Sequence, residues 1–109
     1  MTYRLFLDDI RNPDWVYSEP GEWEICRDMA QAVVIMLEQG CPDLISFDHD
    51  LGEDIPTGYD LAKWLVERDL DHPGFIPDHF RFYVHSANPV GASNIQNLLN
   101  SYLFHKGMS

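Results

Sequence analysis

Positively charged residues are scarce in this chain of 109 residues. Lys and Arg number 7 against 18 Asp and Glu, so the formal net charge is −11 with histidine neutral. A surface this acidic repels duplex phosphates and anionic membranes, so we expect no non-specific DNA binding and no membrane association. A single phosphate group in a metal site remains an accessible substrate, because a bound divalent cation reverses the sign of the local field.

Long apolar runs and cysteine frameworks are also missing. No stretch of about 18 apolar residues is present to cross a bilayer, and no apolar segment near the first residue has the character of a secretory signal. The two cysteines, Cys26 and Cys41, are too few for a disulfide framework and lack the partners of a zinc site, so we expect quiet thiols. These absences predict a cytoplasmic protein.

What is present is the composition of one globular domain. Apolar residues make up 45% of the chain and charged residues 23%, which is close to the average for folded proteins and argues against disorder. The length suits one domain, and we expect it to span residues 1–109.

Short β-type runs alternate with helical patterns along the chain. Four runs predict strands, at residues 3–7, 23–26, 44–47 and 80–84. Residues 10–21 contain two prolines and a glycine without a helical period, so they predict a long loop.

Three helices are predicted from capping residues and apolar spacing. The first follows Asp28 and ends at Gly40, the second begins at the pair Thr57 and Asp60, and the third begins at Asn88, with Pro89 in its first position. The residues expected on their buried sides are Ala30, Val33, Val34 and Leu37; Leu61, Trp64 and Leu65, with the Arg68 stem at the edge; and Ile95, Leu98, Leu99, Tyr102 and Leu103.

This alternation predicts an α/β fold with a mostly parallel sheet of about four strands and three helices as right-handed crossovers. Polar clusters follow three of the strands: Asp8 with Asp9; Asp48, His49 and Asp50; and His85, Ser86 and Asn88. Ligands bind at the carboxyl edge of open α/β sheets, so we expect the three clusters to share one crevice.

Asp8, Asp9 and Asp48 are the candidate metal ligands. Three carboxylates in one place repel and raise one another's pKa values, and a hard divalent cation relieves that repulsion. Ligands that are all oxygen favour Mg²⁺ or Mn²⁺. The alternative is that these aspartates only form turns and cap helices.

His49 and His85 are the candidate proton carriers, because each follows a strand beside the carboxylates. One would act as general base and the other as general acid. The alternative for each is a hydrogen-bonded polar residue at a strand end.

Three further residues are candidates for binding phosphate. The Arg11 guanidinium would clamp a phosphate in bidentate fashion or tie down Asp8 or Asp14. Ser86 and Asn88 would hydrogen-bond a phosphoryl oxygen near the start of the last helix, although Asn88 is equally suited to a plain N-cap.

Aromatic residues gather around the predicted loop. Trp15, Tyr17 and Trp23 are expected to cover the edge of the sheet, with stacking on a nucleobase as the alternative. The remaining histidines have no ligand spacing and are expected at the surface; they are His72, His79 and His105.

The motifs resemble those of response-regulator receiver domains. The matching segments are residues 5–9, 42–48 and 84–87. The resemblance implies a flavodoxin-like fold, Mg²⁺ at the first aspartate pair, Asp48 as phosphoacceptor and Ser86 against the phosphoryl group. Two departures are a missing fifth strand and a missing receiver lysine, for which Lys106 is not a convincing substitute because it follows a helix.

The departures themselves resemble a narrower group of bacterial and phage domains, the cyclic-phosphate-processing receivers. The motifs that carry this resemblance are Asp8-Asp9-Ile10-Arg11, Asp48-His49-Asp50-Leu51-Gly52, Thr57-Gly58-Tyr59-Asp60 and His85-Ser86-Ala87-Asn88-Pro89. The resemblance implies processing of a cyclic phosphate, such as a 2′,3′-cyclic phosphate at an RNA end or a cyclic nucleotide.

The leading hypothesis is therefore a metal-dependent phosphoesterase that opens a cyclic phosphate. Its catalytic residues would be His49, His85, Asp48 and Ser86, with Asp50 orienting His49 or completing the metal shell. The alternative is a non-catalytic signalling receiver in which Asp48 accepts a phosphoryl group. A third possibility is an interaction module with a vestigial site.

Overall fold

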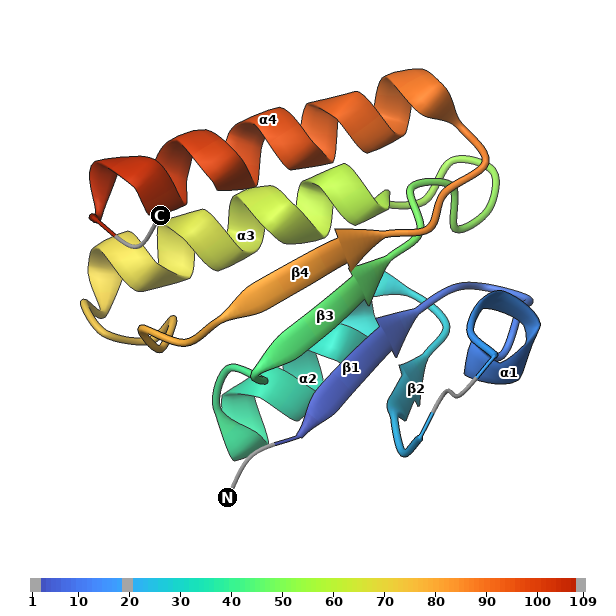
Figure 1. Cartoon of the computed structure of the whole chain (residues 1–109), viewed down its shortest axis with the longest axis horizontal. Helices are drawn as coiled ribbons and strands as arrows, with labels where there is room; N and C mark the ends of the chain where they lie inside the picture. Colours follow the sequence, from blue (N-terminus) through green and yellow to red (C-terminus); the bar gives the residue numbers. More distant parts are fainter. Residues whose placement is uncertain (1–2, 19–20, 108–109) are drawn as a thin grey trace.

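Four parallel strands form one sheet in this computed structural model, which describes residues 3–18 and 21–107. The strands are β1 (Arg4–Leu7), β2 (Glu24–Cys26), β3 (Leu44–Phe47) and β4 (Arg81–Val84). They are ordered β2-β1-β3-β4, and every neighbouring pair is parallel (Figure 1). The predicted α/β fold and its four-stranded parallel sheet are confirmed.

The central strands are buried on both sides, which explains why they are apolar except for Arg4 at the start of β1 and Ser46 within β3. In β3 all four residues are buried, and in β1 the three residues after Arg4 are buried. Strands of parallel sheets read this way because both faces are covered. The outer strands β2 and β4 are more exposed, as edge strands are.

Three long helices begin at the predicted capping residues. They are α2 (Met29–Gln39), α3 (Gly58–Asp71) and α4 (Pro89–His105). Asp28 and Asn88 each accept a hydrogen bond from a backbone N–H in the first turn of their helix, and Thr57 with Asp60 forms a complete capping box.

One element differs from the predicted loop at residues 10–21. A single helical turn, α1 (Pro13–Val16), begins after Asn12 with proline in its first position, and it brings the number of helices to four. A turn of four residues is too short to show an apolar period, so the pattern could not reveal it.

The buried side of α2 also differs from the prediction. Val34 and Leu37 are each 53% exposed, whereas Ala32 and Met36 are fully buried. Most of this helix is apolar, and the i, i+3, i+4, i+7 rule fits residues 29, 32, 33 and 36 as well as residues 30, 33, 34 and 37. Spacing alone could not choose between these two sets.

The hydrophobic core lies between one face of the sheet and the three long helices. Leu5, Leu7, Ile45 and Phe47 point into it and contact buried side chains of α2, α3 and α4. Side chains alternate across a strand, so the residues between them point to the other face. There Phe6, Ser46 and Tyr83 lie side by side in register.

Two other predictions concern what the chain does not contain. Cys26 and Cys41 are free thiols, and burial is the main reason that the pKa of each rises to about 12, as expected for quiet cysteines. Over residues 3–18 and 21–107, no helix has both the length and the apolar character needed to cross a bilayer.

Candidate metal and phosphate site

The carboxyl ends of three neighbouring strands place the site. Leu7, Phe47 and Val84 are aligned in register, and the ladder continues past them: Asp48 donates its backbone N–H to the Leu7 carbonyl and His85 donates to the Phe47 carbonyl, both at 2.9 Å. The next residues, Asp8, Asp48 and His85, therefore line up on the face opposite the core.

Three carboxylates meet at this edge. Oxygen atoms of Asp8, Asp9 and Asp48 lie within 4.8 Å of one another, and the residues Asp8 and Asp48 are only 1% and 6% exposed. A set of carboxylate oxygens with room for water suits a hard divalent cation such as Mg²⁺ or Mn²⁺, so the donor set fits the predicted metal.

Asp8 is the hydrogen-bonded centre of the cluster. One of its oxygens accepts the backbone N–H groups of Ile10 and Arg11, and the other accepts Arg11 Nε at 2.8 Å and faces His85 Nε2 at 3.1 Å. Burial raises the pKa of Asp8, but these hydrogen bonds and the Arg11 charge outweigh it, and the pKa lies below its usual value. With His85 as a fourth donor the lone pairs of this carboxylate are filled, so Asp8 is the least open to an ion of the three predicted metal ligands.

Asp48 has the opposite electrostatic environment. Burial and then the negative charge of Asp8 raise its pKa above the usual value, and the Arg11 charge and the His49 backbone N–H only partly compensate. Its Oδ1 accepts the His49 N–H at 2.8 Å and lies 3.7 Å from Arg11 Nη2. In the described part of the chain, Asp48 Oδ2 and the Asp9 carboxylate have no hydrogen bond, so these oxygens are the ones open to an ion.

Arg11 therefore lies between two carboxylates. Phosphate, Asp8 and Asp14 were its predicted partners, and the contact with Asp8 is present. Its Nη2 also donates to the His85 carbonyl at 3.3 Å. Its side chain is 33% exposed, so the guanidinium is also reachable from solvent.

His49 belongs to a short line of polar side chains. Its Nδ1 lies 2.9 Å from Asp50 Oδ1, and Asn88 Nδ2 donates to the Asp50 carboxylate at 3.3 and 3.5 Å. The His49 hydrogen bond is the main reason that the pKa of Asp50 is lowered. Because Asp50 is an acceptor, Nδ1 carries the proton in the neutral ring and Nε2 keeps a free lone pair.

Two glycines allow the helices to approach this segment. A Cβ atom on Gly91, in the first turn of α4, would lie 2.3 Å from His49 Cγ, and one on Gly58, at the start of α3, would lie 1.9 Å from the Asp48 carbonyl oxygen. Both contacts exclude a larger residue without a shift. The sequence signal for them was a glycine in the first turn of a helical pattern, where it is otherwise unfavourable.

Both ring nitrogens of His85 form hydrogen bonds. Nε2 faces Asp8, Nδ1 lies 2.6 Å from Ser46 Oγ, and the ring stacks on Phe6 with centroids 4.5 Å apart. Its side chain is 4% exposed, and burial is the main reason that its pKa is lowered. This geometry favours a role in orienting Asp8 over the predicted exchange of protons with a substrate.

Ser86 and Asn88 shape the start of α4. Ser86 Oγ accepts the Asn88 backbone N–H at 3.0 Å, and Asn88 Oδ1 accepts the Gly91 N–H at 3.0 Å. The capping role of Asn88 is therefore present, and the phosphate contacts of both residues stay predictions.

Two contributors were missed by sequence reasoning. Ser46 lies on β3 and is fully buried, and Tyr17 reaches it with its hydroxyl 2.6 Å from Ser46 Oγ. The available signal was a hydroxyl residue inside an otherwise apolar strand. Tyr17 also stacks on Trp23, with centroids 5.7 Å apart, so these two rings cover the sheet as expected, whereas Trp15 is 61% exposed.

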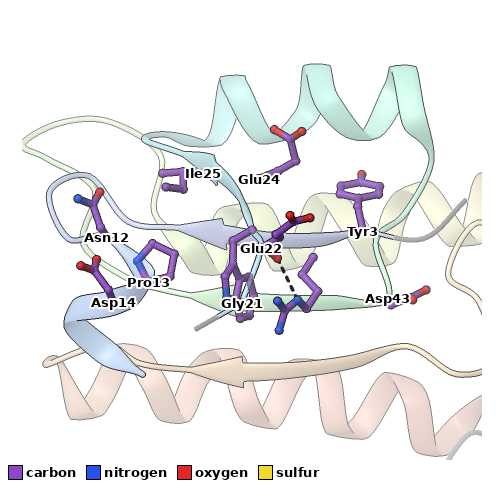
Figure 2. Close-up of a pocket in the computed structure, with 11 residues that line it drawn as sticks. Tyr3, Asn12, Pro13, Asp14, Gly21, Glu22, Glu24, Ile25 and Asp43 are labelled. Carbon is purple, nitrogen blue, oxygen red and sulfur yellow. Dashed lines mark hydrogen bonds between the residues drawn. The ribbon is translucent and has the colours of Figure 1, made fainter. Parts of the chain in front are cut away.

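Two surface hollows are lined by residues outside the cluster of Asp8, Asp9 and Asp48. The larger, about 980 Å³, runs along β1 and β2, where Arg4 Nε donates to the Glu22 carbonyl (Figure 2). The smaller, about 540 Å³, lies between β4 and α4. Asp8, Asp9 and Asp48 line neither hollow. The carboxylates of the larger hollow are Asp14, Glu22, Glu24 and Asp43.

The comparison with protein families gives a match over most of the chain. The model of the cyclic-phosphate processing receiver domain matches residues 3–101. The chain belongs to this family. The matched region runs from β1 into α4, so it contains every residue of the site described above. The comparisons with curated proteins and with solved structures gave no match.

Membership of the cyclic-phosphate processing receiver family confirms the family resemblance and agrees with the fold. The described residues form no fifth strand after α4. Lys106 pairs with Asp69 of α3, so it is not a substitute for the receiver lysine at the site.

Proposed function

We propose that this cyclic-phosphate processing receiver is a metal-dependent phosphoesterase that opens a cyclic phosphate with water. The observation that supports this most directly is that a carboxylate cluster and an oriented histidine occur at the same edge of the sheet. Three carboxylates converge within 4.8 Å, and His49, adjacent in sequence to one of them, has its ring oriented by Asp50. Charge stabilisation and proton transfer are the two needs of phosphate ester hydrolysis.

Asp9 and Asp48 would hold the ion through their open oxygens, with Asp8 adding negative charge beside them. When bound, Mg²⁺ or Mn²⁺ neutralises charge on phosphoryl oxygens and lowers the pKa of water. The chain's own task is to hold these carboxylates together. Arg11 does so as a fixed cation, 2.8 Å from Asp8 and 3.7 Å from Asp48.

His49 is the proposed general base. Its Nε2 lone pair accepts the proton of the attacking water while the water oxygen bonds to phosphorus. The ring P–O bond breaks, the freed oxygen takes a proton from solvent, and the product is a phosphate monoester. Asp50 stabilises the imidazolium that forms, as an orienting carboxylate does in other acid–base pairs.

The substrate we propose is a small cyclic phosphodiester, either a 2′,3′-cyclic phosphate at an RNA end or a cyclic nucleotide. We assign the binding of its phosphoryl oxygens to Arg11, Ser86 and Asn88. The last two lie at the start of α4, whose N-terminal dipole favours an anion. A net charge of −11 disfavours extended contact with a long nucleic acid, so we expect recognition of the terminal group alone.

The test is turnover of 2′,3′-cyclic and 3′,5′-cyclic nucleotides with Mg²⁺, with Mn²⁺ and with a chelator. We expect metal-dependent monoester formation. His49→Ala should lose about 10²–10⁴-fold in turnover, the usual contribution of a positioned proton carrier. His105→Ala is the control, because His105 is exposed at the end of α4. Equal rates in the parent, His49→Ala and chelated protein would disprove the proposal.

The signalling alternative has its own signature. Asp48 Oδ2 is open in the described structure, so acetyl phosphate could modify it, and intact mass would then rise by about 80 Da. A stable adduct that is absent in Asp48→Asn, together with no ester turnover, would favour a phosphoacceptor over an esterase.

A further inference from the structure

A line of hydrogen-bonded side chains leads away from the carboxylate cluster across the sheet face opposite the core. Asp8 Oδ2 lies 3.1 Å from His85 Nε2, His85 Nδ1 lies 2.6 Å from Ser46 Oγ, and Ser46 Oγ lies 2.6 Å from Tyr17 OH. One continuous polar chain therefore links the ends of β1 and β4, the strand β3 and the segment containing α1.

The chemistry of the groups orders the protons along this chain. An ionised carboxylate only accepts, so His85 Nε2 donates to Asp8, and in the neutral ring Nδ1 is then the acceptor. Ser46 donates its hydroxyl proton to Nδ1 and is left to accept from Tyr17. Each donor finds an acceptor in this order, and the neutral His85 ring has a single tautomer.

The surroundings hold the chain in place. Ser46 is fully buried on β3, where an unpaired hydroxyl costs about 1–3 kcal/mol. The His85 ring stacks flat on Phe6, with an interplanar angle of 6°, and the Tyr17 ring stacks on Trp23 at 4°. The rings therefore fix where the hydrogen-bonding atoms point.

We propose that Tyr17 and Ser46 are positioning residues for the divalent-ion site. They hold His85 in the Nε2–H tautomer, His85 orients Asp8, and Asp8 with Arg11 sets the spacing of the cluster. The segment that carries α1 is thereby coupled to the ion, although it supplies no ligand. This inference rests on the proposed metal site and not on the proposed ester hydrolysis.

Outer partners of metal sites commonly change ion affinity by about 10–100-fold. We expect Ser46→Ala to weaken Mn²⁺ binding about 10-fold by titration calorimetry, and Tyr17→Phe about 3-fold, at the low end because it acts through Ser46. Tyr83→Phe is the matched control, since Tyr83 lies on the same face and its hydroxyl has no hydrogen bond within the described structure.

A double-mutant cycle separates positioning from general destabilisation. If the effect passes through Ser46, adding Tyr17→Phe to Ser46→Ala should change Mn²⁺ affinity no further. Unfolding in the absence of ion is measured alongside, because a merely structural role would change stability without this coupling. Additive losses of affinity, or losses equal to those of Tyr83→Phe, would overturn the proposal.

Ring ¹⁵N spectra of His85 supply a readout that needs no substrate. We expect the Nε2–H tautomer in the parent and tautomer mixing in Ser46→Ala; mixing already in the parent would overturn the proposal. Mn²⁺ binding without ester turnover would remove the proposed function and leave this inference standing. No Mn²⁺ binding by the parent would remove both the metal site and the inference.

Discussion

Asp48 and Asp69 are two buried aspartates with opposite electrostatic environments. Asp48 is 6% exposed and Asp69 is 2% exposed. Burial raises the pKa of both, but Asp69 receives enough donors to lie below its usual pKa, whereas Asp48, next to Asp8, stays above it. Burial alone therefore does not identify a functional acid; the identity of its neighbours does.

The donors around Asp69 make it a structural tie. The Ile76 N–H donates to it at 2.8 Å, Tyr102 OH donates at 2.6 Å, and Lys106 Nζ forms an ion pair with it. Together these contacts fasten the end of α3 to the loop after it and to the end of α4. Asp48 has no such set and is open to a cation from outside the chain.

Asp69→Asn tests whether Asp69 is a structural tie. A carboxamide keeps one acceptor oxygen in place of two, so donors among Ile76, Tyr102 and Lys106 lose their partner. We expect a loss of about 3 kcal/mol in unfolding free energy by urea denaturation. Asp71→Asn, exposed in the same helical turn, should stay within about 0.5 kcal/mol. Equal losses for both would contradict the assignment.

The loss of unfolding free energy at low pH should depend on Asp69. Its pKa is lowered in the folded state, so its contribution is complete above the unfolded value near 4 and is lost as pH falls through the lower folded value. Between about pH 5 and pH 3 the parent should lose more unfolding free energy than Asp69→Asn. Parallel pH profiles would show that Asp69 is not the titrating group. The measurement is urea unfolding at each pH.

Asp48→Asn tests the functional side of the comparison, and it should raise the unfolding free energy, whereas Asp69→Asn should lower it. Removing one of three adjacent charges relieves repulsion, and we expect a gain of about 1 kcal/mol in unfolding free energy without divalent ions. The parent should gain about 2.7 kcal/mol with Mg²⁺ or Mn²⁺ at 100 times Kd, and the variant should gain nothing. Asp14→Asn, an exposed site outside the cluster, is the control. A loss of stability in Asp48→Asn without ions would contradict the repulsion.

Gly91→Ala should separate stability from function. Alanine favours a helix by about 1 kcal/mol, but its Cβ would meet three atoms of the His49 ring at 2.3 to 2.6 Å. We expect unfolding free energy to change by less than about 1 kcal/mol while cyclic phosphate turnover falls, because the ring must leave its place beside Asp50. Ser93→Ala, exposed two residues further along α4, should keep parental turnover. Full activity in Gly91→Ala would show that this ring position is not needed.

Local chemistry made much of the fold predictable. The strand β3 and the caps at Asp28, Thr57 and Asn88 are short-range features, and the structure has them where the sequence indicated. The buried side of α2 was wrong, because a helix that is apolar on most sides leaves its rotation to tertiary packing. The turn α1 was missed because one turn has no period.

The candidate site was predictable only in part, for a related reason. Asp8 and Asp48 follow strands whose ends meet, which topology implies. The partners of His85 did not follow, because the pairing with Ser46 depends on strand register and the Tyr17 contact on how a segment folds over the sheet. Two histidines that look alike in the sequence therefore have different hydrogen-bond partners in the structure.

The shared register of β1, β3 and β4 makes the site sensitive to insertions and deletions in particular places. Asp8, Asp48 and His85 lie on one face of the sheet because each directly follows the last aligned residue of its strand, and side chains alternate between the two faces. Losing one residue inside β3 would turn Asp48 toward the helices while leaving composition and length nearly unchanged. A residue gained in the connector between α3 and β4 would leave this alternation intact. For this chain we therefore expect changes of loop length to be tolerated, whereas the number of residues from the last strand pair to the aspartate must stay the same.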